Sequence, residues 1–274
     1  MSPKLSIIVL NWNSKDDLVS CLSHIKKNTR LKEKEIIVVD NGSTDGSVEY
    51  MKSNHPRTVL IRNEENLGVS VSRNQAIRAS KGEYVLLLDV DTKVGRGAID
   101  SLIAGMDAHP EVGTSGAKLV NPDGKLQYSC REFPTVLSKF VFRRAPGKFF
   151  DEFLSKEEYR DWDHNSFAYV GYVIAACLII RRKCLENIGV LDESFFYGPE
   201  DVDYCLRAWK AGWKVMYNPK AVVVHKEARI TKKGGTLRQL KNPLFWTHVK
   251  GLVIYFWKHR YTFGRPGPFF KILD

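Results

Sequence analysis

Short apolar runs alternate along the first 120 residues with longer segments in which apolar side chains recur every three or four positions. The apolar runs predict strands over residues 5–10, 35–40, 58–62, 84–92 and 112–120. The helical spacing predicts helices over residues 15–28, 69–80 and 97–109, with a short helix ending at Lys52. This alternation of strands and helices predicts an α/β fold with a doubly wound, mostly parallel sheet.

The second half of the chain is less regular. Residues 132–164 are aromatic and basic without a clear period, which indicates an inserted subregion or a flexible lid. Regular patterning returns with an apolar strand at 173–180 and a helix at 202–211 that ends at Gly212. Two short strands follow at 214–217 and 221–224, and His225 comes directly after the second.

Polar residues collect in four loops, each of which follows a predicted strand. The loops are residues 11–13, 40–45, 66–68 and 89–92. The carboxyl ends of parallel strands meet at one edge of a sheet, where open α/β folds bind their ligands. We therefore expect these four loops to border one ligand site.

The buried run at 84–92 ends in two carboxylates one residue apart, Asp89 and Asp91. Carboxylates this close repel each other unless a cation lies beside them. Their hard oxygens suit Mg²⁺ or Mn²⁺, and these ions in turn favour phosphate oxygens. For a lone Asp-x-Asp, the alternative is an ordinary polar turn after a strand.

The net charge of +11 is concentrated in the last 49 residues. Residues 226–274 carry eleven lysines and arginines against Glu227 and Asp274. Within them, residues 243–260 combine tryptophans, aliphatic side chains and cations, a pattern typical of a helix at a membrane interface. The alternative is a helix that docks its apolar side on the rest of the protein. Because no nucleic-acid motif accompanies this local charge, we expect no nucleic-acid partner.

Cysteine usage and the apolar runs bear on the cellular compartment. The five cysteines lack any CxxC or metal-ligand spacing, which predicts free thiols in a reducing compartment. Met1 leads almost directly into the first strand, so we expect no signal peptide. The sequence contains no run of eighteen apolar residues, so we expect no membrane span. The sequence therefore predicts a cytoplasmic protein.

Six segments, in order and spacing, resemble family 2 glycosyltransferases of the glycosyltransferase A fold. They are LSIIVLNWN (5–13), IIVVDNGSTDGS (36–47), NLGVSVSRNQAI (66–77), LLLDVDT (86–92), YGPEDVDYCLRAWKAGWKV (197–215) and VVVHKEA (222–228). The resemblance is strongest to bacterial rhamnosyltransferase-like members, whose acidic signature is similar to residues 200–212. It implies a catalytic domain over 1–225, with a nucleotide-binding half about 1–120 and an acceptor half about 121–225. A basic, aromatic helical extension over 226–274 completes the division.

The resemblance also implies a nucleotide-sugar donor and a set of residues that bind it. The donor-binding positions are Val9, Asn11, Asp40, Asn41, Asn66, Gly68, Arg73, Asp89 and Asp91. Asp40 would accept hydrogen bonds from a uracil or thymine ring, or else cap the following helix. Arg73 would meet the base or the phosphates, or else be a solvated surface charge. Asp91 is the expected direct ligand of Mn²⁺ or Mg²⁺, with Asp89 at the ribose or an ion-bound water and His225 as a further ligand.

The acceptor half needs a base. Asp201 is the predicted base, with Glu200 as a positioning group or as the base instead; the alternative is that both acids merely start a helix. Acceptor contacts are expected from Phe196, Tyr197, Gly171 and Trp12. With one base and no evident nucleophile, the sequence predicts direct displacement and inversion at the anomeric carbon.

The expected donor is dTDP-rhamnose or a UDP-sugar, and the expected acceptor is a glycan or a polyprenyl-linked sugar at the inner face of the cell membrane. A nucleotidyltransferase is the competing enzyme class, but it usually carries a glycine-rich phosphate loop after the first strand. Here that loop is Asn11-Trp12-Asn13-Ser14.

Overall fold

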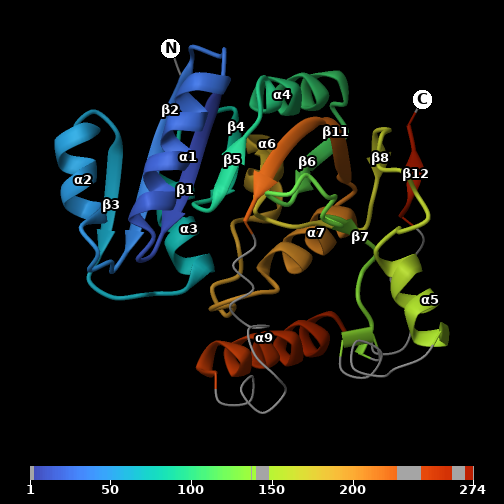
Figure 1. The fold of residues 1–274 in the computed structure, drawn as a ribbon. Helices are drawn as coiled ribbons and strands as arrows, with labels where there is room; N and C mark the ends of the chain where they lie inside the picture. Colours follow the sequence, from blue (N-terminus) through green and yellow to red (C-terminus); the bar gives the residue numbers. More distant parts are fainter. Residues whose placement is uncertain (1–2, 137, 140–147, 227–241, 261–268, 274) are drawn as a thin grey trace.

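The computed structural model describes residues 3–136, 138–139, 148–226, 242–260 and 269–273. Its centre is a 10-stranded sheet in the order β12-β8-β11-β6-β10-β4-β1-β2-β3, with β5 paired to β11 (Figure 1). The strands are β1 (Leu5–Asn11), β2 (Lys34–Asn41), β3 (Val59–Asn63), β4 (Tyr84–Asp89), β5 (Thr92–Val94), β6 (Val112–Val120), β8 (Ala168–Tyr169), β10 (Cys177–Arg181), β11 (Lys214–His225) and β12 (Lys271–Ile272). A separate pair joins β7 (Cys130–Arg131) and β9 (Tyr172–Val173).

Helices cover both faces of the large sheet. They are α1 (Lys15–Asn28), α2 (Ser47–Asn54), α3 (Val69–Ala79), α4 (Ala98–Ala108), α5 (Lys148–Glu157), α6 (Arg182–Ile188), α7 (Glu200–Lys210) and α9 (Pro243–His259). Side chains alternate across each strand, so Ile7 of β1 belongs to the core cluster that contains residues of α1 and α4. Ile8 belongs to the cluster on the other face, which contains residues of α3, α6 and α7. The predicted α/β fold with a mostly parallel sheet is confirmed.

The structure differs from the predicted elements in several places. The strand predicted over 84–92 ends at Asp89 as β4, and Thr92 begins the separate strand β5. The expected strand at 173–180 is two strands: β9 belongs to the small pair, and β10 runs antiparallel between β4 and β6. The two short strands after residue 213 form a single strand, β11, with an irregularity between Asn218 and Val222. Helix α7 starts two residues earlier than predicted, at Glu200, because its first-turn acids favour the positive end of the helix dipole.

Part of the irregular middle region forms a helix. Residues 148–157 form α5, and Glu132 accepts a hydrogen bond from Tyr159 at 2.7 Å. Residues 137 and 140–147 of this predicted subregion, and 227–241 and 261–268 of the extension, lie outside the described residues. Among the helices that are described, none is long and apolar enough to cross a bilayer.

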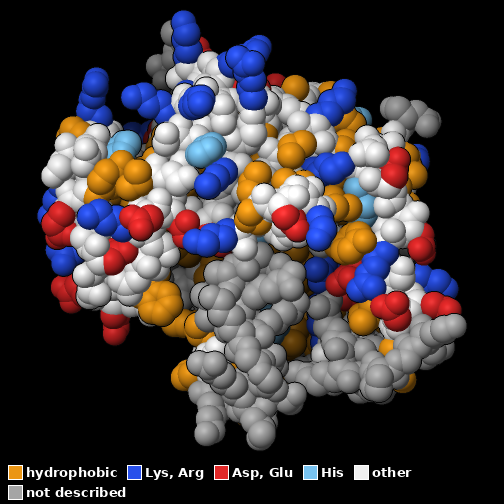
Figure 2. Space-filling view, in the orientation of Figure 1, with side chains coloured by type: hydrophobic (Ala, Val, Ile, Leu, Met, Phe, Trp, Pro, Cys, Tyr) orange, Lys and Arg blue, Asp and Glu red, His pale blue; other side chains and the backbone are white. Residues whose placement is uncertain are grey.

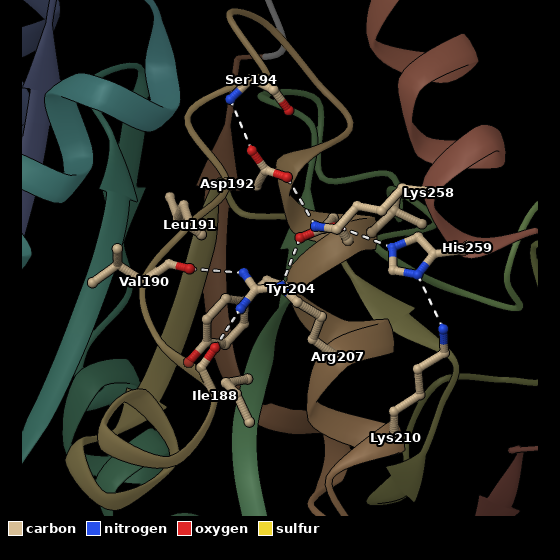
Figure 3. Close-up of polar contacts among 12 residues, drawn as sticks. Ile188, Val190, Leu191, Asp192, Ser194, Tyr204, Arg207, Lys210, Lys258 and His259 are labelled. Atoms are coloured by element: carbon tan, nitrogen blue, oxygen red, sulfur yellow. Dashed lines mark hydrogen bonds and ion pairs between the residues drawn. The ribbon is translucent and has the colours of Figure 1, made fainter.

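Helix α9 packs against α7 through a buried charge cluster. The Asp203 side chain is fully buried and accepts bonds from Arg207 at 2.8 Å, Lys258 at 2.7 Å and His259 at 2.9 Å (Figure 3). Burial opposes ionisation of Asp203, but these donors hold the pKa of its carboxyl well below the usual range. One side of α9 is therefore docked on the rest of the protein, as the second of the two alternatives for residues 243–260 predicts.

We expect Asp203→Asn to lower the free energy of unfolding by about 3–5 kcal/mol, because it removes the buried charge that Arg207 and Lys258 share. Urea unfolding at neutral pH measures this change, with Asp123→Asn in an exposed ion pair as the control. Because the pKa of Asp203 is depressed, its contribution is present above the ordinary aspartate pKa and is lost as the pH falls. An Asp203→Asn protein as stable as the control would contradict the prediction.

Candidate active site

A cavity of about 900 Å³ lies at the carboxyl edge of the sheet. It brings together most of the residues that the sequence singled out. Those that line it are Trp12, Asn41, Asn66, Gly68, Arg73, Asp89, Asp91, Phe196, Tyr197, Glu200, Asp201 and His225. The two acidic motifs, more than 100 positions apart in the chain, therefore face one space.

A potential metal site forms where β4 ends. One ligand atom from each of Asp89, Asp91 and His225 lies within 4.8 Å of the others. His225 arrives there because Thr92 of β5 pairs with it in β11, and the Lys226 N–H donates to the Asp91 carbonyl at 3.1 Å. Two carboxylates and one imidazole form a donor set that suits Mn²⁺, and also Mg²⁺ where oxygens dominate.

The orientation of His225 is fixed by a residue that sequence reasoning missed. Its Nδ1 lies 2.9 Å from Gln127 Oε1, while its Nε2 lies 3.4 Å from Asp91 Oδ1. The Gln127 amide also donates to the His225 carbonyl and to Asn121, both at 2.7 Å. With Nδ1–H donating to Gln127, the lone pair of Nε2 points toward Asp91, as metal-binding histidines require. Gln127 lies in a loop without a motif, so no local signal marks it.

Arg73 connects the two acidic motifs. Its guanidinium is 2.5 Å from Asp89 Oδ1 and 3.2 Å from Glu200 Oε1, and it donates to the Ala175 carbonyl at 3.1 Å. The side chain is only 3% exposed, which excludes the predicted alternative of a solvated surface charge. The planar guanidinium can span two carboxylates at once, as a lysine ammonium cannot.

Glu200 and Asp201 begin α7 at the edge of the cavity. The Asp201 carboxylate accepts from the Val202 N–H at 2.8 Å and the Ala175 N–H at 3.3 Å. Burial and, next, the charge of Asp201 raise the pKa of Glu200 to about 7, although the charge of Arg73 opposes the shift. Burial also raises the pKa of Asp201, against the two N–H donors. Two adjacent acids with raised pKa values can exchange a proton near neutral pH, which a helix start alone does not require.

The loop at 66–68 is held beside the cavity by an asparagine network. Asn41 accepts from the Leu67 N–H at 3.0 Å and donates to Asn66 at 2.7 Å, and Asn66 accepts from the Gly68 N–H at 2.9 Å. The Val69 N–H donates to the Phe196 carbonyl at 2.7 Å, so this loop also supports the segment before α7.

Four residues of the predicted site lie behind the cavity or away from it: Val9, Asn11, Asp40 and Gly171. Val9 is in the core. Asp40 is buried and accepts from Asn11 at 2.9 Å and from the Ser43 N–H at 2.9 Å, so it holds the turn after β2. A Cβ on Gly171 would lie 2.7 Å from the Arg131 carbonyl, so this glycine serves close packing of protein backbone.

Sequence reasoning also missed one wall of the cavity. Leu244, His248 and Leu252 of α9 line it, next to Gly198 and Pro199. Arg131 of β7 and Lys139 and Arg160 of the irregular middle region also line the cavity. The glycine in the middle of the apolar run 243–260 was the available signal, because a glycine inside a helix marks close approach of another segment.

The fold and this site together define a glycosyltransferase of the A fold. Residues 6–189 match the family model for glycosyl transferase family 2, and the chain belongs to that family. The family excludes the competing nucleotidyltransferase interpretation.

Relatives of known name agree with this class. Over 244 residues the chain is 28% identical to an N-acetylglucosaminyl-diphospho-decaprenol L-rhamnosyltransferase of Mycobacterium tuberculosis (strain ATCC 25618 / H37Rv), covering 84% of this chain and 78% of that protein. Over 164 residues it is 32% identical to a poly(ribitol-phosphate) beta-glucosyltransferase of Bacillus spizizenii, covering 56% of this chain and 26% of that one.

Solved structures share the fold. A Pyrobaculum calidifontis mannosyltransferase in complex with GDP-Man and Mn²⁺ superposes with a TM-score of 0.61 at 21% identity, over 97% of this chain and 66% of that one. GalNAc-T7 with UDP, GalNAc and Mn²⁺ gives a TM-score of 0.63 at 16% identity, over 95% and 55% respectively.

Proposed function

We propose that the enzyme is an inverting, metal-assisted glycosyltransferase that uses dTDP-rhamnose or a UDP-sugar. The acceptor would be a hydroxyl of a glycan or of a polyprenyl-linked sugar in bacterial surface polysaccharide synthesis. One observation carries the proposal: Asp89, Asp91 and His225 share a cavity with Glu200 and Asp201, and Arg73 joins the two groups. The name of the mycobacterial relative supports rhamnose as the sugar and a lipid-linked acceptor.

The donor would lie along the ends of β1, β2 and β4. Asn11 Oδ1 is buried and has no hydrogen-bond partner in the described part of the chain, which supports a bound ligand group nearby. Asp40 is the proposed acceptor for the N–H of the base, as the sequence predicts; the base would have to reach it past the turn after β2 that Asp40 holds. Asn41, Asn66 and Gly68 would shape the adjacent loop.

Asp91 and His225 would hold Mn²⁺ or Mg²⁺ directly. Asp89 Oδ1 is engaged by Arg73, which supports the predicted role of Asp89 at the ribose or at an ion-bound water. When bound, the ion would neutralise negative charge on the departing nucleotide diphosphate.

Asp201 would act as the base in a single displacement. The acceptor oxygen bonds to the anomeric carbon while the bond from that carbon to the diphosphate oxygen breaks, and its electron pair leaves with the nucleotide diphosphate. The acceptor proton passes to the Asp201 carboxylate. Phe196, Tyr197 and Trp12 line the cavity where an acceptor sugar would stack. Backside attack inverts the anomeric configuration; a retained configuration in the product would contradict this mechanism.

The site of action would be the inner face of the cell membrane, to which the protein would bind without spanning it. This follows from the lipid-linked acceptor and from the aromatic and cationic composition of residues 243–260.

A donor screen by nucleotide release tests the proposed function. The wild-type protein is assayed with dTDP-rhamnose and a panel of UDP-sugars, with and without Mn²⁺. We expect release from one donor class, stimulated by the ion and reduced by about 10²-fold or more in Asp91→Ala, because that variant loses the direct ligand. The exposed Asp161→Asn serves as the control. Metal-independent release that Asp91→Ala does not change would overturn the metal assignment.

A further inference from the structure

Helix α9 has one face that belongs to the enzyme interior. Gly251, Leu252, Tyr255 and Phe256 are buried, and Leu252 also lines the cavity. A Cβ on Gly251 would lie 2.3 Å from the Gly198 carbonyl, so the backbone of α9 touches the loop that leads into Glu200 and Asp201. This face of α9 is therefore a structural part of the active site.

The opposite face of α9 carries an exposed stripe that continues to Arg260, the residue after the helix. Its members follow one another at intervals of three or four residues: Trp246, Lys250, Val253, Trp257 and Arg260. The large apolar members are 53%, 57% and 79% exposed at Trp246, Val253 and Trp257, respectively. No acidic residue occurs between 243 and 260. In Figure 1 this helix lies at the lower edge of the molecule, and Figure 2 shows hydrophobic side chains at the surface along the lower left edge of the same view.

The direction of the stripe is fixed relative to the cavity. Lys258 and His259 bind Asp203, and Lys258 also binds Asp192 at 2.8 Å (Figure 3). These contacts prevent α9 from turning about its axis, so the stripe faces away from the sheet while the inner face borders the cavity.

We propose that this stripe, Trp246, Lys250, Val253, Trp257 and Arg260, binds an anionic lipid surface and places the cavity beside it. Tryptophan rings favour the headgroup level, and the cations favour anionic phospholipids. A second copy of this chain is the competing occupant. Two copies related by a two-fold axis would bring like charges together along an acid-free stripe, whereas anionic headgroups complement it.

This inference rests on the proposed function in one respect: an acceptor carried on a lipid would reach the cavity along the α9 wall. The surface itself depends only on the exposed residues. Vesicle binding and sugar transfer can therefore fail independently.

Flotation with vesicles tests the surface. The full chain is mixed with phosphatidylcholine vesicles with or without phosphatidylglycerol, at low and high salt. We expect binding to the anionic vesicles, weakened by salt and reduced by about tenfold or more in the double variant W246A/W257A. Lys250→Glu should weaken binding too, whereas Lys52→Glu on α2 and the double variant V59A/V222A should not.

Two results would overturn the proposal. One is equal flotation of W246A/W257A, Lys250→Glu and wild type. The other is a wild-type dimer that W246A/W257A converts to a monomer, which would assign the stripe to a second copy. Transfer to a water-soluble acceptor should remain at the wild-type rate in Lys250→Glu. A wild-type protein that binds vesicles but transfers no sugar would contradict the proposed function and leave the lipid-binding proposal standing.

Discussion

Asp201→Asn is expected to lower kcat for sugar transfer by about 10²–10⁴-fold, because the amide cannot accept the acceptor proton. Donor binding should change little, since Asp201 bonds to the Val202 and Ala175 N–H groups and to no donor-side residue among those described. Glu200→Gln is the matched comparison. If Glu200→Gln loses transfer and Asp201→Asn retains it, Glu200 is the base.

The pH dependence of the wild type follows from the same pair. Burial raises the pKa of both acids, that of Glu200 to about 7, so the fraction able to accept a proton falls as the pH decreases. We therefore expect an acidic limb in kcat at a higher pH than the range in which an ordinary aspartate titrates. A rate that stays constant down to the ordinary pKa of an aspartate would contradict a buried carboxylate base.

Arg73→Met is expected to impair both transfer and stability. It removes the charge that pairs with Asp89 and Glu200, and loss of one partner from a buried ion pair costs about 3–5 kcal/mol. Arg73→Lys should recover only part of the loss. It keeps the positive charge, but one ammonium cannot reach both carboxylates with the geometry of a guanidinium. Arg78→Met, on the exposed side of the same helix, is the control.

A pH profile separates positioning from simple support of the fold. Arg73 lowers the pKa of Glu200, so its removal should move the acidic limb of kcat to higher pH. An Arg73→Met enzyme that is less stable but keeps the wild-type profile would show that Arg73 acts only on folding.

The sequence predicted the parts of the site that depend on local patterns. Asp89 and Asp91 come at the end of a buried strand, and Glu200 and Asp201 start a helix. The apolar pattern of each element, and the place of the acids at its end or start, therefore located them. The pairing of β5 with β11 that brings His225 to Asp91 joins residues more than 100 positions apart, and no local pattern reports it.

Long-range contacts also explain what the sequence could not predict. The loop residue Gln127 is recognisable only by its contact with His225. Arg73 has the same local signature as an exposed helical arginine, and only its burial against Asp89, Ala175 and Glu200 distinguishes it. For residues 243–260 the sequence left two alternatives, a helix at a lipid surface and a helix docked on the protein, because an aromatic helix suits either. The structure shows a docked face and, beside it, an exposed stripe.

The buried charge cluster at Asp203 affects how results from shortened forms of this enzyme can be interpreted. A chain that ends before Pro243 would lose Lys258 and His259, leave Arg207 as the remaining described cationic partner of Asp203, and open one side of the cavity. Inactivity of such a fragment would therefore report damage two residues from Asp201, whether or not lipid contact matters. Single replacements on the outer stripe separate those two effects, and truncation cannot.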